Sequence, residues 1–168
     1  MAIPLRRANP ANIAAGLRTF FVTSSIAGKR RLLQSHRAAK LLIDVLYDYR
    51  SQQKYWLHDF VVMPDHFHVL ITVGPELSVE RAVQFIKGGF AFRAGKEIEF
   101  VAPVWQRGFS EVRVSDPQAA ARIREYIQQN PVMAGCVRTA AEYEYCSAYP
   151  GFILDELPQG LKPHLFEC

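Results

Sequence analysis

Two histidines stand two residues apart inside the most apolar stretch of this chain, residues 60–73. The stretch is rich in β-branched residues, which predicts strand structure. Successive side chains of a strand point to opposite faces, so His66 and His68 share one face and Phe67 points to the other. Two imidazoles side by side on a rigid strand are a ready pair of metal ligands. The alternative is a core pair whose ring nitrogens bond to backbone carbonyls.

Length and composition place the chain among ordinary globular proteins. It has 168 residues, of which 49% are apolar and 21% charged, enough to bury one core. We therefore expect one domain over residues 1–168, with residues 150–168 forming an irregular C-terminal tail rich in Pro and Gly. No apolar run is long enough to cross a bilayer, and the N-terminus lacks the apolar segment of a signal peptide. Three cysteines without metal-type spacing agree with reduced thiols and a cytoplasmic location.

Basic residues gather in the first third of the chain. Residues 1–60 carry ten lysines and arginines against three aspartates, a net charge of +7, whereas the whole chain is +4 and the remainder is therefore −3. A basic third suits a polyanionic partner such as nucleic acid. On charge alone, a solvated surface rich in Lys and Arg is the simpler interpretation.

The spacing of apolar residues predicts strands and helices in alternation. Strands are predicted over residues 18–24, 55–63, 66–73 and 111–114, with a further short one around Val104–Trp105. The second and third may also join into one long strand across Pro64–Asp65. Helices are predicted over residues 36–53 and from Val79 onward, where Ser78 caps the start and Gly88–Gly89 weaken the helix near its end. The resulting order, β-α-β-β-α-β, predicts an α+β, ferredoxin-like antiparallel sheet with helices on one face. The histidine strand is expected at its centre.

A third helix follows this unit. Ser115 or Asp116 is expected to cap it, and the helix should end at Gln129 because Pro131 disfavours helical geometry in the residue before it. Tyr126 and Asn130 are four residues apart, so they share one face of this helix. A phenol is mostly protonated near neutral pH, but a nearby divalent cation can lower its pKa and polarise a phosphate ester. The plain alternatives are a half-buried aromatic at Tyr126 and a helix stop at Asn130.

Four short motifs follow one another along the chain: Phe60–Leu70 around the histidines, Ile86–Phe90, Val104–Phe109 and Tyr126–Val132. In this order they resemble the single-tyrosine HUH transposases, and specifically the REP-associated tyrosine transposases. Each motif alone is a weak signal, whereas four in register are a strong one. The resemblance covers most of the chain, from about Arg18 to Tyr149.

The resemblance implies a transposase-like enzyme, a metal-dependent nuclease and strand transferase that acts on single-stranded DNA at hairpin-forming sequences. It assigns Tyr126, on the additional C-terminal helix, as the nucleophile that forms a 5′-phosphotyrosine and leaves a free 3′ hydroxyl. It assigns His66 and His68 as metal ligands and Asn130 as the third, polar ligand. The metal implied is Mg²⁺ or Mn²⁺, although two imidazoles also suit zinc or nickel. The oligomeric state, monomer or homodimer, stays open.

Several further side chains are candidate DNA contacts, because Lys and Arg neutralise phosphates and Trp stacks on unpaired bases. They are Lys29, Arg30, Arg31, Lys87, Arg93, Trp105, Gln106 and Arg107. For Trp105 a place in the sheet core is an equal alternative. At the level of function, the alternative to the enzyme is a module that binds structured single-stranded nucleic acid without cutting it. A third hypothesis is a metal-dependent hydrolase that uses the two histidines without Tyr126.

Overall fold

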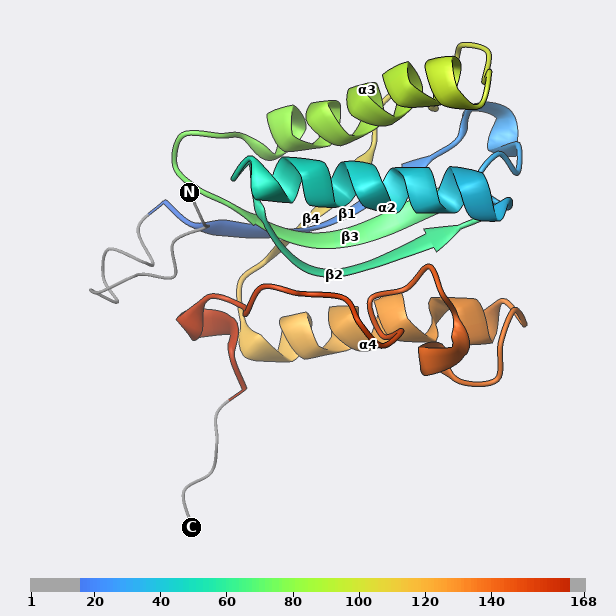
Figure 1. Ribbon diagram of the computed structural model, residues 1–168. Helices are drawn as coiled ribbons and strands as arrows, with labels where there is room; N and C mark the ends of the chain where they lie inside the picture. The colour runs from blue at the N-terminus through green and yellow to red at the C-terminus, as the bar shows by residue number, and fades with distance from the viewer. Residues whose placement is uncertain (1–15, 164–168) are drawn as a thin grey trace.

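The centre of the fold is a four-stranded antiparallel sheet in the order β2-β3-β1-β4 (Figure 1). The computed structural model describes residues 16–163, and its strands are β1 (Arg18–Ser25), β2 (Trp56–Met63), β3 (His66–Val73) and β4 (Ser110–Val114). The histidine strand β3 lies between β1 and β2, and it begins where His66 pairs with Ser25 on one side and Met63 on the other. Its predicted central position is confirmed, and β2 and β3 are two separate strands.

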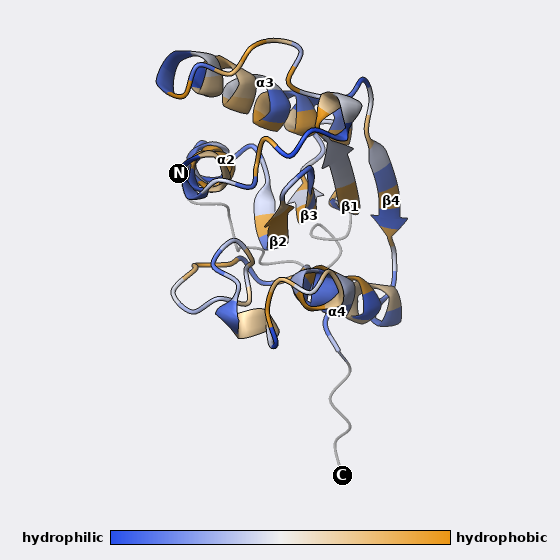
Figure 2. Cartoon of the chain, turned by 90° about the vertical axis from the view of Figure 1, so that its right-hand side faces the viewer, coloured by the Kyte–Doolittle hydropathy of each residue, from blue (hydrophilic) through white to orange (hydrophobic). Residues whose placement is uncertain are grey.

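Helices cover both faces of the sheet. The helices are α2 (His36–Ser51), α3 (Val79–Glu97) and α4 (Pro117–Met133). Figures 1 and 2 show α2 and α3 side by side on one face, and α4 on the opposite face. The predicted α+β class and its β-α-β-β-α-β order are confirmed. The two sheet faces are therefore unequal, and the face under α4 is the one to which the two histidines point.

The larger core lies between the sheet and the pair α2 and α3. Ser35 caps α2 by accepting a hydrogen bond from the backbone N–H of Ala38, as Ser residues favour at this position. α3 does not end near Gly88–Gly89, as the sequence suggested, but continues to Glu97. A Cβ atom at Gly89 would lie 2.7 Å from the Tyr49 ring. Gly89 therefore lets α2 and α3 approach closely, and this packing offsets its low helix propensity.

Two predicted elements differ from the structure. Val104–Trp105 is not a strand, because Trp105 makes only a single bridge to Ile26, just after β1. α4 does not end at Gln129, since Pro131 lies inside the helix, which ends at Met133. Proline lacks an N–H and costs one helical hydrogen bond, but the side chain of Pro131 is buried and its packing offsets that loss.

The segment after α4 runs back over the edge of β2. Up to residue 163 its regular elements are the short 3₁₀ helices η2 (Ala140–Glu142) and η3 (Gln159–Leu161). Asp155 joins its backbone N–H to the carbonyl of Leu57 at 2.8 Å, and its carboxylate pairs with Arg50. Leu161 is buried in a second, smaller core under α4. Within residues 16–163, no helix is long and apolar enough to cross a membrane.

Candidate active site

The two histidines lie next to one another on the sheet face that α4 covers. Their ring centroids are 4.9 Å apart, with the planes at 77°. His68 is almost fully buried, with 4% of its surface exposed, whereas His66, at the start of β3, is partly open to solvent. The period of two along β3 brings them to one face, as the sequence predicted.

Both imidazoles use the same ring nitrogen for a hydrogen bond within the protein. Nδ1 of His66 lies 2.7 Å from a carboxylate oxygen of Asp65, and Nδ1 of His68 lies 2.8 Å from the hydroxyl of Thr23. Nε2 of His68 is buried without a hydrogen-bond partner in the described part of the chain. A buried polar atom left unpaired is costly and calls for an explanation. Imidazoles that ligate a metal commonly hold their second nitrogen in this way.

Burial keeps His68 neutral. Desolvation, followed by the neighbouring charge of His66, lowers the pKa of His68 to about 3. Its lone pair is therefore available at neutral pH, as a metal ligand requires. Partial burial acts to raise the pKa of Asp65, but the hydrogen bond and charge of His66, with the charge of Lys29, outweigh it and lower that pKa. Asp65 is thus an anion that orients His66.

Tyr126 extends from α4 over the same histidine. Its ring meets His68 edge-on at a centroid distance of 5.4 Å and meets Phe21 at 5.9 Å. About half of the residue, 54%, is exposed. Phe21 is itself stacked on His68 at 5.1 Å, so the three rings form one cluster. Tyr126 is thereby held by ring contacts and still open to a large substrate.

Asn130, one helical turn after Tyr126, reaches an open pocket of about 480 Å³ beside His66. The lining residues are Lys29, Arg31, Met63, Pro64, Asp65, His66, Asn130, Ala134 and Cys136. No group of three His, Cys, Asp or Glu side chains suited to a metal occurs among residues 16–163. A metal here would therefore need a different third ligand, and Asn130, which lines the same pocket as His66, carries an amide oxygen that could serve. The donor set of two imidazoles and one amide fits a divalent cation.

The three cations of the basic loop after β1, Lys29, Arg30 and Arg31, have two different surroundings. Lys29 and Arg31 line the pocket beside His66. Arg30 instead donates hydrogen bonds to the backbone carbonyls of Ala27, at 2.8 Å, and Pro103. Lys29 and Arg31 are thus placed for an anionic ligand, whereas Arg30 ties the loop to the segment before Trp105.

Two of the remaining candidate DNA contacts, Lys87 on α3 and Trp105, join the segment between α3 and β4 to α3. Lys87 donates hydrogen bonds to the carbonyls of Gln106 and Gly108, at 3.1 and 2.8 Å, and burial lowers its pKa. Trp105 donates from its indole nitrogen to the carbonyl of Lys87 and packs edge-on against Phe90. Both side chains therefore form hydrogen bonds within the protein, and Trp105 packs against the larger core.

The other candidates separate by location. Gln106 is exposed and its backbone N–H bonds to the carbonyl of Ser25, the residue that pairs with His66. Arg107 follows it and is also exposed, so this segment lies at the histidine end of the sheet. Arg93 pairs with Asp48 and Glu97 on the helical layer of the opposite face. The structure does not bring Arg93 to the histidines.

A buried ionic contact beneath α4 was not predicted from the sequence. Asp59 on β2, 1% exposed, accepts a hydrogen bond from Nε of Arg124 at 2.5 Å and from the hydroxyl of Ser147 at 2.7 Å. Burial raises the pKa of Asp59, while Arg124, Ser147 and Gln128 act to lower it. The available signal was an aspartate inside an apolar strand, a position that calls for a partner.

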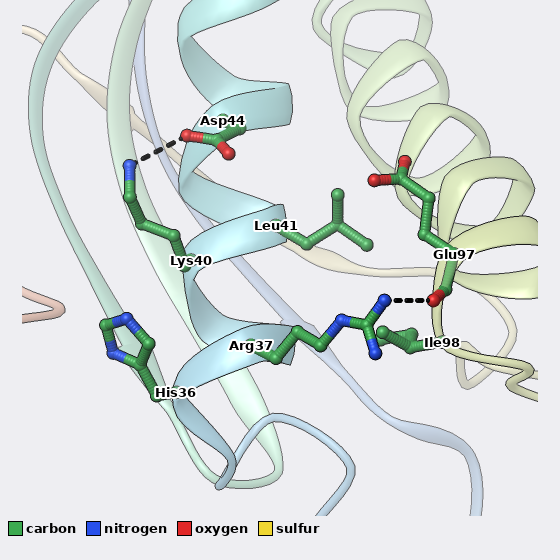
Figure 3. A pocket seen from close by; sticks show the side chains of 7 residues that line it. All are labelled: His36, Arg37, Lys40, Leu41, Asp44, Glu97 and Ile98. Carbon is green, nitrogen blue, oxygen red and sulfur yellow. Dashed lines mark hydrogen bonds and ion pairs between the residues drawn. The ribbon is translucent and has the colours of Figure 1, made fainter.

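A second pocket, of about 230 Å³, lies between α2 and α3 (Figure 3). Its cations are engaged: Arg37 donates to the backbone carbonyl of Glu97 at 2.6 Å, and Lys40 pairs with Asp44 at 2.9 Å. The pocket is on the helical layer opposite α4, so it is separate from the histidine site.

Comparison with solved structures defines the class of fold. A REP-associated tyrosine transposase bound to a REP hairpin superimposes with a TM-score of 0.67 at 19% identity, covering 98% of this chain and 99% of that one. A protein of Deinococcus radiodurans that is assigned as a transposase superimposes with a TM-score of 0.53 at 22% identity, over 75% of this chain and 96% of the other. The fold is therefore that of tyrosine transposase structures.

The sequence itself gives the family. The chain belongs to the IS200-like transposases, whose family profile matches residues 21–130, from β1 through Asn130 on α4. An uncharacterized protein of Haemophilus influenzae is 27% identical over 99 residues, which is 46% of this chain and 54% of the relative. The chain thus matches about half the length of that curated relative.

Proposed function

We propose that this protein is a metal-dependent endonuclease and strand transferase that cuts and rejoins single-stranded DNA at hairpin-forming sequences. The observation that carries the proposal is the edge-on contact of the half-exposed Tyr126 with His68. The nucleophilic side chain then lies directly against the buried imidazole of His68, and His66 and Asn130 line the adjacent pocket. Family membership supports the transposase-like reaction, and the solved relative bound to a REP hairpin supports the choice of hairpin DNA.

In the proposed reaction, Oη of Tyr126 releases its proton to solvent and attacks the scissile phosphorus. The bond from phosphorus to the 3′ oxygen breaks, and that oxygen takes up a proton from solvent to become a free 3′ hydroxyl. The tyrosine remains on the 5′ phosphate as an ester of similar energy, so the reverse attack by a 3′ hydroxyl rejoins DNA without a nucleotide cofactor. His66, His68 and Asn130 would hold a Mg²⁺ or Mn²⁺ ion, which would supply positive charge that polarises the phosphate and favours the phenolate.

The protein's own side chains prepare this site. Asp65 and Thr23 orient the two imidazoles through their Nδ1 atoms, as the hydrogen-bond partners of metal-binding histidines do. Lys29 and Arg31 offer positive charge in the pocket beside His66, which suits a neighbouring phosphate of the strand. Gln106 and Arg107 extend the same end of the sheet with exposed polar groups.

The test is covalent capture of the cut strand. The protein is incubated with manganese and single-stranded DNA that forms a hairpin with single-stranded flanks, and the products are separated under denaturing conditions. We expect a protein–DNA adduct that chelator prevents and that Tyr126→Phe does not form, although this variant should still bind the hairpin. Cleavage without an adduct would favour a hydrolase that uses only the histidines. Binding without cleavage would favour the non-cutting module.

A further inference from the structure

The helix that carries Tyr126 is attached to the sheet by few apolar side chains. The buried residues of α4 are only Ala120, Ile127 and Pro131. Of these, only Ile127 has a long, flexible apolar side chain that can pack between the side chains of the sheet. By contrast, seven residues of α2 are buried. Since apolar stabilisation is roughly proportional to buried area, apolar packing holds the position of α4 less firmly than that of α2.

An ion pair between Arg124 on α4 and Asp59 on β2 also attaches the helix to the sheet. Asp59 on β2 is buried beneath α4, and Nε of Arg124 lies 2.5 Å from its Oδ2 atom. The other carboxylate oxygen accepts from the hydroxyl of Ser147, which in turn accepts from the backbone N–H of Phe60. Asp59 is therefore fixed by the sheet and by the segment after α4. An anion held in this way fixes the cation that pairs with it.

Arg124 and Tyr126 flank the buried stripe of α4 on opposite sides. At about 100° of rotation per residue, Ile127 and Pro131 define the stripe, Arg124 lies to one side of it and Tyr126 to the other. The contact of Arg124 with Asp59 on β2 and the contact of Tyr126 with His68 thus lie on opposite sides of the α4 helix axis. Rolling the helix about that axis would break one contact and displace the other.

We propose that the Arg124–Asp59 ion pair is a positioning device that sets the rotation of α4 and thereby holds Tyr126 over His68. The proposal rests on the proposed function, in which Tyr126 is the nucleophile. Arg124 acts through the helix and not on the substrate. Displacing a reacting group by about 1 Å can slow a reaction on the order of 100-fold, so the pair should affect the rate of attack more than the binding of DNA.

The experiment compares Arg124→Met, Arg124→Lys and Asp59→Asn with the wild type. Hairpin affinity, the single-turnover rate of adduct formation at saturating DNA and the melting temperature are measured for each. We expect Arg124→Met and Asp59→Asn to lower the rate on the order of 100-fold with hairpin affinity nearly unchanged, and Arg124→Lys to restore part of the rate. Because Asp59 is 1% exposed, it cannot reach DNA, and its variant excludes a direct phosphate contact as the cause.

A second ion pair of the same kind provides the matched control. Arg50 and Asp155 join two other elements at 2.7 Å, with both side chains mostly buried. Arg50→Met should lower the melting temperature and leave the single-turnover rate at the wild-type value. If Arg124→Met also changes only the melting temperature, the pair is merely structural and the proposal is overturned. Weaker hairpin binding with a wild-type rate at saturating DNA would instead make Arg124 a DNA contact and would also overturn the proposal.

A readout that does not depend on activity separates this proposal from the proposed function. Hydrogen exchange of the α4 amides in the protein without DNA reports how firmly the helix is held. We expect faster exchange in α4 for Arg124→Met but not for Arg50→Met. If the wild type forms no adduct, the proposed function fails, while unchanged exchange in α4 would overturn the positioning role by itself.

Discussion

The hydroxyl of Thr23 lies 2.8 Å from Nδ1 of His68, across the β1–β3 pairing. The side chain of Thr23 lies on the sheet face under α4, next to His68. It therefore determines how the His68 ring is oriented and which nitrogen remains free. The free nitrogen is Nε2, the buried atom without a partner among the described residues.

We predict that Thr23→Val weakens metal binding by about 10- to 100-fold, the usual effect of removing a partner of a ligating histidine. The change keeps the shape of the side chain but removes the acceptor for Nδ1–H. Manganese affinity measured by calorimetry checks it. Thr19→Val is the control, because Thr19 bonds to Thr72 on the same sheet face and does not touch His68. Equal manganese affinity in wild type and Thr23→Val would contradict the role of Thr23 in orienting His68.

A second prediction concerns acid stability and rests on the buried His58. Nδ1 of His58 donates to the backbone carbonyl of Asp155, and Nε2 accepts from the hydroxyl of Thr72. Burial lowers the pKa of His58 from 6.5 to about 4. Between these values the unfolded chain binds a proton that the folded chain does not, so stability falls as the pH falls from 6.5 through 4. The loss attributable to His58 is roughly 3 kcal/mol.

Urea unfolding at several pH values checks this prediction. Since the raised pKa of Asp59 contributes a slope of opposite sign, the informative quantity is the difference between wild type and His58→Gln. We expect the variant to lose less stability on acidification, because glutamine can donate and accept in the neutral state but does not titrate. Parallel stability curves for the two proteins would show that His58 is not responsible.

A third prediction uses the paired glycines of α3. Gly89→Ala would place a Cβ atom 2.7 Å from the Tyr49 ring, whereas a Cβ atom at Gly88 meets nothing within 4 Å. Overpacking costs about 1–3 kcal/mol, and replacing glycine by alanine in a helix gains up to about 1 kcal/mol. We therefore expect Gly88→Ala to stabilise the protein and Gly89→Ala to destabilise it in thermal unfolding. Stabilisation by both changes would mean that α2 and α3 do not meet closely at Tyr49.

The sequence was sufficient for the features that depend on periodicity. Alternation along residues 66–73 identified the histidine face, and the apolar stripes located α2 and the start of α3. The rule that a helix ends before proline failed at Pro131, because burial in the tertiary structure offset a local cost. The predicted strand at Val104–Trp105 failed for a related reason: Trp105 is taken up by the core between α3 and β3.

Contacts between distant residues were not accessible from one sequence. The Arg124–Asp59 pair joins residues 65 positions apart, and local spacing carries no record of which cation faces a buried aspartate. Similarly, three neighbouring cations in the basic loop looked equivalent. The fold distinguishes them, since Arg30 bonds to backbone carbonyls while Lys29 and Arg31 line the pocket.

This division of the basic loop gives a fourth prediction. The double variant Lys29→Ala with Arg31→Ala should bind single-stranded hairpin DNA more weakly and with less dependence on salt. Each phosphate contact to a single strand contributes a slope of roughly 0.7 in log affinity against log salt, so the slope should fall by roughly 1.4. Fluorescence anisotropy over a salt series measures it. Arg30→Ala should leave the slope closer to that of wild type, and the reverse ranking would contradict the division.

The last prediction concerns Asn130, which lines the pocket with His66 one turn beyond Tyr126. If its amide oxygen completes the metal site, Asn130→Ala should raise the manganese concentration needed for half-maximal adduct formation, and excess manganese should partly restore the rate. Asn130→Asp should bind manganese at least as tightly, because a carboxylate is the stronger ligand for a hard cation. The backbone carbonyl of Asn130 also accepts from Ala134 at 3.0 Å, a bond that both variants keep, so helix stability changes little. An unchanged manganese midpoint in Asn130→Ala would remove Asn130 from the metal site and leave it a structural residue at the end of α4.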